Sequence, residues 1–317
     1  MTQDTSSEDD LDFPDEEERR TVARRLFAYS RKAIIEAAFI EHLLVNHPGF
    51  KTSLEAYDRV FQLGRALGLQ QGAVVAGPPG SGKTALIKHF LKSLPSSSLF
   101  EEGAGALAIR LPARPNVGQV VGSLLRQLKY PFPQVSVHTL AIKRDVVIEA
   151  MRQKGTRLLF IDEAHHLKSQ TKVRTRHFEG SSTTDLLREF MDEVPLGICL
   201  SGTDVLLDLG EVDPHLESRL SARFSLADFV CDAHWYGFLK AFKRHAKFDL
   251  SVIEVRDEAD RLHKATQGNL RNFKRLITEA VLVAVDDHKE IVNTEHLKLA
   301  FSRVRGNVQR AGDVYAD

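Results

Sequence analysis

Gly77-Pro-Pro-Gly-Ser-Gly-Lys-Thr84 is the stretch that decides the fold of this chain. It follows the apolar run Ala73–Ala76 and precedes residues 85–91, whose apolar side chains recur at helical spacing. A strand, a glycine-rich loop and a helix, in that order, are the context in which this motif binds phosphate. Its glycines let successive backbone N–H groups point at one anion, and the helix N-terminus adds partial positive charge. The sequence therefore predicts a phosphate-binding loop.

The side chains of this loop have distinct expected roles. Lys83 is expected to reach the β- and γ-phosphates of ATP, and the Thr84 hydroxyl to bind Mg²⁺. We therefore predict ATP and Mg²⁺ as cofactors. The residues expected to hold the nucleotide are Gly77, Pro78, Pro79, Gly80, Ser81, Gly82, Lys83, Thr84 and Ala85.

The composition is typical of a soluble globular protein, with 43% hydrophobic and 27% charged residues in 317. No run of eighteen apolar residues and no secretory signal are found, and Cys199 and Cys231 are too few for a disulfide framework. We expect a cytoplasmic protein that does not enter a membrane.

The formal net charge of zero hides an uneven distribution. Residues 1–18 hold nine of the 43 acids and none of the 43 bases, which leaves the rest of the chain with a charge of about +9. A basic body indicates a polyanionic partner such as DNA. The acidic segment could compete with that partner, or it could be a solvated tail without such a role.

The expected fold class is α/β, a parallel sheet covered by helices with a small all-helical lid after it. After the acidic tail (1–18), helices at 19–45 and 52–67, with a turn at Asn46–Lys51, are expected to form an N-terminal appendage (19–70). Alternating strands and helices indicate the α/β core (71–231). Helices alone follow, which predicts the lid (232–305) and a short tail (306–317). Strands are expected at 73–76, 106–111, 158–162, 196–201 and 224–230.

Two acidic residues end the third expected strand. Ligands of such sheets bind outside the carboxyl ends of the strands, so Asp162 and Glu163 should face the nucleotide. We expect Asp162 to hold Mg²⁺ and Glu163 to polarise the water that attacks the γ-phosphate. Asp162-Glu-Ala-His165 also spells a helicase signature, but the chain lacks a second nucleotide-binding lobe. We therefore interpret His165 as coincidental, and His165 and His166 have no evident third metal ligand in the sequence.

Further polar residues are candidates for the same site. Thr203, or failing that Ser201, is expected to position the water or contact the γ-phosphate, although either hydroxyl could instead cap the next helix. Arg219, or else Arg223, could complete a neighbouring subunit's site, and a surface ion pair is the alternative for both. Gly268-Asn-Leu-Arg271 opens a lid helix, from which Arg271 could reach the γ-phosphate and report lid closure.

Together these motifs resemble AAA+ P-loop NTPases of the initiator and clamp-loader branch, and within it the transposition ATPases of the TniB, TnsC and MuB kind. The subfamily resemblance covers roughly residues 40–305. It is carried by His47-Pro-Gly-Phe50, Leu158-Leu-Phe-Ile-Asp-Glu-Ala-His-His-Leu167 and Val194-Pro-Leu-Gly-Ile-Cys-Leu-Ser-Gly-Thr-Asp204.

The resemblance implies a Mg-dependent ATPase that forms a ring or helical filament of identical subunits on double-stranded DNA. Such a protein recruits a transposase, with or without a target-selection protein, and ATP hydrolysis releases it. In relatives, the loop after the second strand and the next helix grip the DNA backbone. Here these hold Arg110, Arg114 and Arg126, and Lys172 and Arg174 lie in a second basic stretch.

Two other functions remain open from the sequence. One is an AAA+ switch that acts on protein partners, of the secretion or loader type, without stable DNA binding. The other is a scaffold that binds ATP but hardly hydrolyses it, which Glu163 argues against. Binding of duplex DNA with and without a non-hydrolysable ATP analogue separates the first two.

Overall fold

The computed structural model describes residues 24, 27–67, 70–94, 105–172, 183–211, 213–220, 222–306 and 314–315. The acidic segment 1–18 and Arg174 lie outside these residues, and only the backbone of Lys172 is described. None of the helices in the described ranges has the length and apolar character that crossing a bilayer requires.

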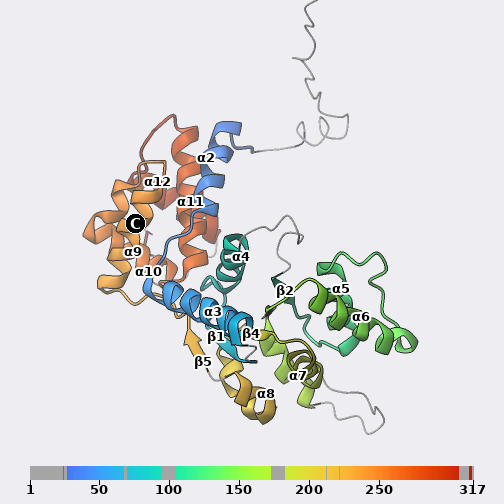
Figure 1. Ribbon diagram of the computed structural model, residues 1–317. Coiled ribbons are helices and arrows are strands. Elements are labelled where there is room, and N and C mark those ends of the chain that lie inside the picture. The colour runs from blue at the N-terminus through green and yellow to red at the C-terminus, as the bar shows by residue number, and fades with distance from the viewer. Residues whose placement is uncertain are drawn as a thin grey trace, which may run out of the picture.

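The centre of the molecule is a sheet of parallel strands in the order β2-β3-β4-β1-β5 (Figure 1). The third expected strand has the predicted bounds, the first and second differ from them by one residue at one end, and the fourth is shifted by one residue at both ends. The strands are β1 (Gly72–Ala76), β2 (Ala106–Arg110), β3 (Leu158–Asp162), β4 (Gly197–Gly202) and β5 (Ala222–Ser225).

Alternate side chains of the strands pack into two different cores, because successive residues of a strand point to opposite faces. Val74, Leu159 and Ile161 pack into the larger core, under α5 (Val117–Gln127), α6 (Leu140–Gln153), α7 (Thr183–Glu193) and α8 (Pro214–Arg219). Val75 and Phe160 face the other way, toward α3 (Pro48–Leu67) and α4 (Lys83–Ser93). Helices therefore cover both faces of the sheet.

The helical lid lies at the opposite end of the molecule from α5 and α6 (Figure 1). Its core is rich in aromatic rings, with Trp235, Phe238, Phe242 and Phe273 in mutual contact. The lid is formed by α9 (Ala233–His245), α10 (Arg256–Thr266), α11 (Leu270–Asp286) and α12 (Thr294–Arg305).

The segment expected to be an N-terminal appendage packs in two places. Helix α2 (Arg31–His42) begins at its N-cap Ser30 and buries Ala33 and Ile40 in the lid core, beside α11. Helix α3 instead packs on the sheet through residues such as Tyr57. The predicted turn at Asn46–Lys51 is wrong at its second half, because α3 already begins at Pro48. Proline is well suited to a first helical position, where no N–H is needed.

The last strand is shorter than predicted. Strand β5 ends at Ser225, and the next N–H, of Leu226, donates to Ala76 O at 2.8 Å. Beyond it the chain leaves the sheet, and Phe229 N–H binds Gly268 O in the lid at 3.0 Å. Residues 226–232 are therefore the connection between core and lid rather than strand.

Candidate nucleotide-binding site

The loop after β1 is fitted closely to the segments around it. A Cβ at Gly77 would lie 2.2 Å from Leu226 O, and one at Gly80 would lie 2.6 Å from Asn269 Oδ1. Gly80 and Gly82 also have φ of 92° and 99°, which side chains disfavour. Helix α4 begins at Lys83, so its unpaired N–H groups lie at the loop and can bind an anion.

The Lys83 ammonium lies over the loop. Its Nζ donates to Gly77 O at 2.7 Å, to Pro78 O at 2.8 Å and to Ser81 Oγ at 3.3 Å. Burial lowers the pKa of Lys83, while the charges of Glu163 and Asp162 oppose that shift. A phosphate in the loop would offer this cation stronger, charged acceptors in place of the two carbonyls.

Thr84 and Asp162 meet from two different elements. Thr84 Oγ1, in the first turn of α4, donates to Asp162 Oδ2, at the end of β3, over 2.7 Å. Asp162 is buried, and its Oδ1 accepts Glu163 N–H at 3.0 Å. A hydroxyl and a carboxylate are hard oxygen ligands of the kind that Mg²⁺ prefers, so the two residues fit the predicted metal site.

Glu163 is held between a cation and a histidine. It has a left-handed φ of 55°, which is strained for a glutamate and common at functional sites. Arg110, at the end of β2, contacts Glu163 Oε1 over 3.1 Å, and His165 Nδ1 lies 3.4 Å from Oε2. The pairing of Arg110 with Glu163 was not predicted, because it depends on β2 and β3 being neighbours in the sheet.

His165 has closer contacts with the site than the sequence indicated. Burial, followed by the charge of His166, lowers the pKa of His165. Glu163 is a candidate third ligand beside the two histidines, because ligand atoms of Glu163, His165 and His166 lie within 4.8 Å of one another.

Of the two hydroxyl candidates at the end of β4, Thr203 contacts His165, which itself lies beside Glu163. Its backbone N–H donates to His165 Nδ1 at 3.5 Å, and the adjacent Gly202 O accepts Gly77 N–H at 3.1 Å. Ser201 is fully buried, and its hydroxyl has no hydrogen-bond partner among the described residues.

The lid touches the loop directly through the start of α11. Arg271 N–H donates to Gly80 O at 3.1 Å, and the charge of Arg271 adds to burial in lowering the pKa of Lys83. Asn269, the N-cap of α11, donates through Nδ2 to Pro79 O at 3.0 Å and to Asp228 Oδ1 at 2.8 Å. No role was predicted for Asn269, although a polar residue before a helix signals a cap.

Arg219 and Arg223 lie toward the amino ends of the strands, away from this site. Arg219 ends α8 just before β5, whose first residue pairs with Ala73 near the start of β1. Within the chain, Arg219 contacts Asp192 at 2.6 Å, and Arg223 contacts Glu217 and Leu207 O. Neither arginine can be assigned to the phosphate loop of its own subunit from these contacts.

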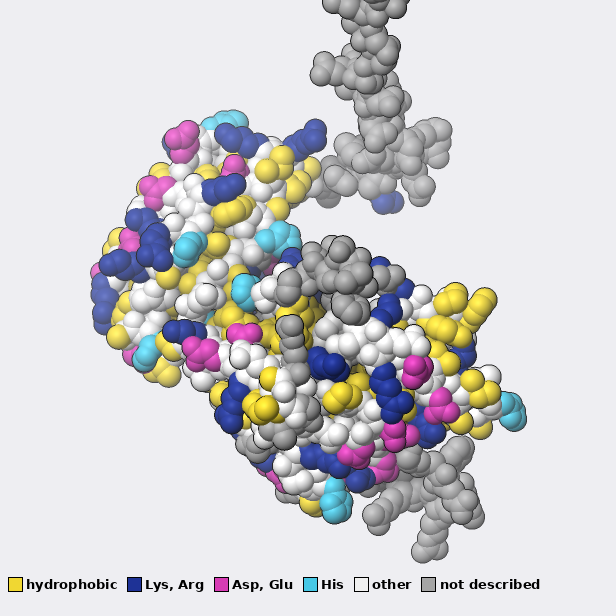
Figure 2. All heavy atoms as spheres, viewed as in Figure 1, with side chains coloured by type: hydrophobic (Ala, Val, Ile, Leu, Met, Phe, Trp, Pro, Cys, Tyr) yellow, Lys and Arg dark blue, Asp and Glu magenta, His cyan; other side chains and the backbone are white. Residues whose placement is uncertain are grey.

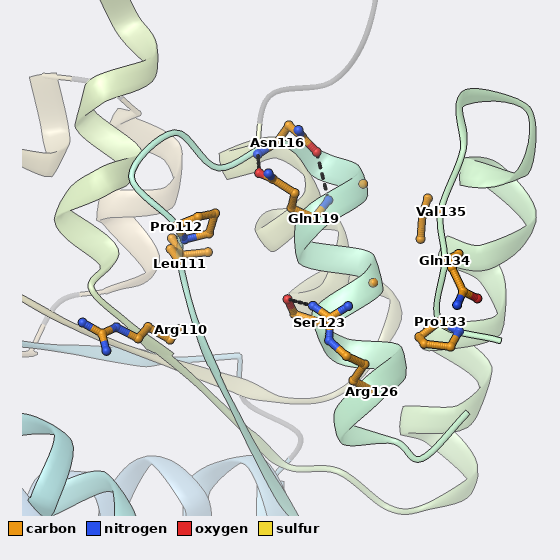
Figure 3. Close-up of a pocket in the computed structure, with 12 residues that line it drawn as sticks. Arg110, Leu111, Pro112, Asn116, Gln119, Ser123, Arg126, Pro133, Gln134 and Val135 are labelled. Carbon is orange, nitrogen blue, oxygen red and sulfur yellow. Dashed lines mark hydrogen bonds between the residues drawn. The ribbon is translucent and has the colours of Figure 1, made fainter. Parts of the chain in front are cut away.

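Two of the arginines expected to contact DNA lie along a groove of about 680 Å³ beside α5. Arg110 and Arg126 line it, and Figure 3 shows them with Gln119 and Ser123 of α5 and with its N-cap Asn116. Arg126 donates to Ser123 Oγ at 2.9 Å. Arg114 is exposed in the segment between β2 and α5. Arg110 therefore belongs both to the lining of the groove and to the surroundings of Glu163.

The sheet order, the phosphate loop and the helical lid define a P-loop NTPase of the AAA+ class. Within that class, the chain belongs to the family described as bacterial TniB protein, which matches residues 37–228. The match covers more than half of the chain and confirms the resemblance found in the sequence.

Solved structures share the fold at low sequence identity. The Aeropyrum pernix ORC2 protein, in ADPNP and ADP complexes, is 18% identical with a TM-score of 0.62, over 83% of this chain and 71% of that one. Drosophila ORC bound to DNA is 17% identical with a TM-score of 0.59, and the match covers 96% of this chain and 71% of that one. Domain III of the Thermotoga maritima replication initiation protein DnaA is 16% identical with a TM-score of 0.51, and the match covers 87% of this chain and 98% of that one. No curated protein matches the chain.

Proposed function

We propose that this protein is an ATP-dependent regulator of DNA transposition. It binds duplex DNA without sequence preference, oligomerises on it as a ring or filament, and recruits a transposase, with or without a target-selection protein. Hydrolysis of ATP then disassembles the complex. Membership of the TniB family supports this proposal, as does the occurrence of nucleotide-bound and DNA-bound proteins among the structures with the same fold.

In this proposal, ATP hydrolysis uses several side chains of one subunit and one arginine of the adjacent subunit. Lys83 and the N-terminus of α4 bind the phosphates, Thr84 and Asp162 hold Mg²⁺, and Glu163 orients the attacking water. Magnesium, when bound, neutralises phosphate charge. Thr203 and Arg271 contact the γ-phosphate in this proposal. Arg219, or else Arg223, reaches the site of the adjacent copy, exchanging its intrachain partner for the phosphoryl group.

The position of Arg110 is the observation that carries the DNA part of the proposal. Its side chain is 73% exposed and lines the groove, yet it also contacts the carboxylate of Glu163. A cation paired with Glu163 weakens that carboxylate as an acceptor for water. DNA phosphate that attracts Arg110 would free Glu163, so hydrolysis would begin after DNA is bound.

A second candidate function is supported by exposed hydrophobic side chains in the connection from α5 to α6 and in the first turn of α6. Phe132, Val137 and Ile142 are 67%, 80% and 66% exposed within eleven residues of chain, and Figure 2 shows hydrophobic side chains at this end of the molecule. Exposed apolar patches mark protein-binding surfaces. A switch that acts on protein partners without stable DNA binding would use such a surface.

Fluorescence anisotropy of a labelled duplex separates the two functions. At low salt, a non-hydrolysable ATP analogue should raise the affinity for DNA strongly, and Lys83→Ala should abolish that increase. The affinity should not depend on DNA sequence and should fall steeply with salt. No DNA binding with the analogue would remove the proposal and leave the protein-partner switch.

A further inference from the structure

His47 carries a buried hydrogen-bond donor that no described residue uses. Its Nδ1 accepts Phe50 N–H at 3.4 Å, which caps the start of α3. In a neutral imidazole the other nitrogen then carries the proton. That nitrogen, Nε2, is buried and has no hydrogen-bond partner among the described residues. Burial lowers the pKa of His47 to about 4, so the ring is neutral near pH 7.

The segment that holds His47 packs against the connection between core and lid. The His47 ring lies 5.1 Å from the ring of Phe229 in the connection between core and lid. A Cβ on the adjacent Gly49 would lie 3.4 Å from Leu226 Cδ2, and Leu226 O is the atom against which Gly77 of the loop is pressed. Phe229 in turn is bonded to the lid at Gly268 O. The segment of His47 and Gly49 and the first residue of the phosphate loop, Gly77, therefore approach the same connection, at Leu226 and Phe229.

The strand order indicates which part of a nucleotide would reach His47. Strand β1 carries the loop, β3 with Asp162 and Glu163 lies on one side of it, and β5 lies on the other. The γ-phosphate faces the two acids. The nucleoside must then extend toward β5 and the connection that leaves it, where Phe229 and His47 lie.

The surroundings of His47 suit an aromatic base better than a phosphate or a metal. Its described ring neighbours are Phe50 and Phe229, with centroids 6.0 and 5.1 Å away, and the neutral imidazole brings no positive charge. No charged group contributes to the shift of its pKa. In the described part of the chain, the one group of side chains placed to share a metal is Glu163, His165 and His166.

We propose that His47 recognises the nucleobase, with Nε2–H donating to an acceptor nitrogen of the adenine ring while Phe50 and Phe229 form the apolar surroundings. This inference rests on the proposed ATPase function and adds a residue that determines specificity for the base. A buried donor left unpaired is unfavourable, so the site favours a ligand that offers an acceptor at this position over one that does not.

The test compares a ligand that has a base with one that has none. Calorimetry on the full chain without DNA measures the affinity for Mg-ATP and for inorganic tripolyphosphate. His47→Ala should weaken ATP binding by roughly three- to tenfold and leave tripolyphosphate binding unchanged. His47→Gln, which retains an N–H donor, should restore part of the ATP affinity.

Two control variants show whether a loss of ATP binding is specific to His47. Lys83→Ala should lose both ligands, and His89→Ala, whose ring contacts Phe50 from α4 at 5.6 Å, should lose neither. Equal ATP affinity of His47→Ala and the wild type would overturn the inference alone. A parallel loss of both ligands in His47→Ala would also overturn it. A wild type that binds no ATP would overturn the proposed function itself.

Discussion

Arg110 is the residue through which DNA binding and hydrolysis are connected in this account. Arg110→Ala removes the cation beside Glu163, so ATP turnover without DNA should rise severalfold, and stimulation by DNA should be lost. The salt slope of DNA binding should fall by about 1, because one phosphate contact is removed. Steady-state ATPase assays with and without duplex test this. Arg152→Ala, whose side chain pairs with Glu193 elsewhere, should change neither rate; an unchanged rate for Arg110→Ala would contradict the coupling.

His47 should also make stability depend on pH. Its pKa is lowered from 6.5 to about 4 in the folded chain, so the unfolded chain takes up a proton first as the pH falls. The contribution of neutral His47 to the free energy of unfolding is therefore fully present above about pH 6.5 and is lost as the pH falls through 4. In urea denaturation, the free energy of unfolding should change less between pH 7 and pH 5 for His47→Gln than for the wild type. The exposed His138→Gln should keep the wild-type difference.

At the scale of elements, the start of α11 connects the lid to the phosphate loop. Asn269→Ala removes the hydrogen bonds to Pro79 O and Asp228 and should reduce the free energy of unfolding by about 1–2 kcal/mol. Asn269→Asp should be worse, since it places a carboxylate against the Asp228 carboxylate and a carbonyl oxygen. Urea denaturation measures both. Equal stability of Asn269→Asp and the wild type would show that this contact does not hold the lid.

Elements whose pattern is local were predictable from the sequence. Leu158–Asp162 is an unbroken apolar run and is strand β3 with the predicted bounds. The continuation of β5 to Val230 was wrong, because the chain leaves the sheet after Leu226, and Phe229 packs on the lid instead. The phosphate loop was visible as a motif. The contacts of Glu163 with Arg110 and of Asn269 with Pro79 join residues far apart in the chain, and no local pattern reveals them.

At the scale of the whole molecule, the acidic segment 1–18 opposes the charge of the remaining chain. If it competes with DNA phosphate for basic residues, its deletion should strengthen DNA binding, most strongly at low salt, where charge interactions are least screened. Anisotropy titrations at two salt concentrations test this. A variant with the nine acids replaced by Asn and Gln should behave like the deletion. Unchanged affinity in both would leave the segment without this role.

The central claim is that ATP lies between neighbouring copies assembled on DNA, with Arg219 of one copy completing the site of the next. Glu163→Gln retains ATP binding but lacks the water-orienting carboxylate, and Arg219→Ala lacks the arginine. Each variant alone should hydrolyse ATP on DNA about a hundredfold or more slowly than the wild type.

Mixing these two variants on duplex DNA is the most direct measurement. The Glu163→Gln copy can supply Arg219 to a neighbour that still has Glu163, so the mixture should recover a clear part of the wild-type ATPase rate. A mixture as inactive as its two components, or an Arg219→Ala protein with the wild-type rate, would contradict the shared site.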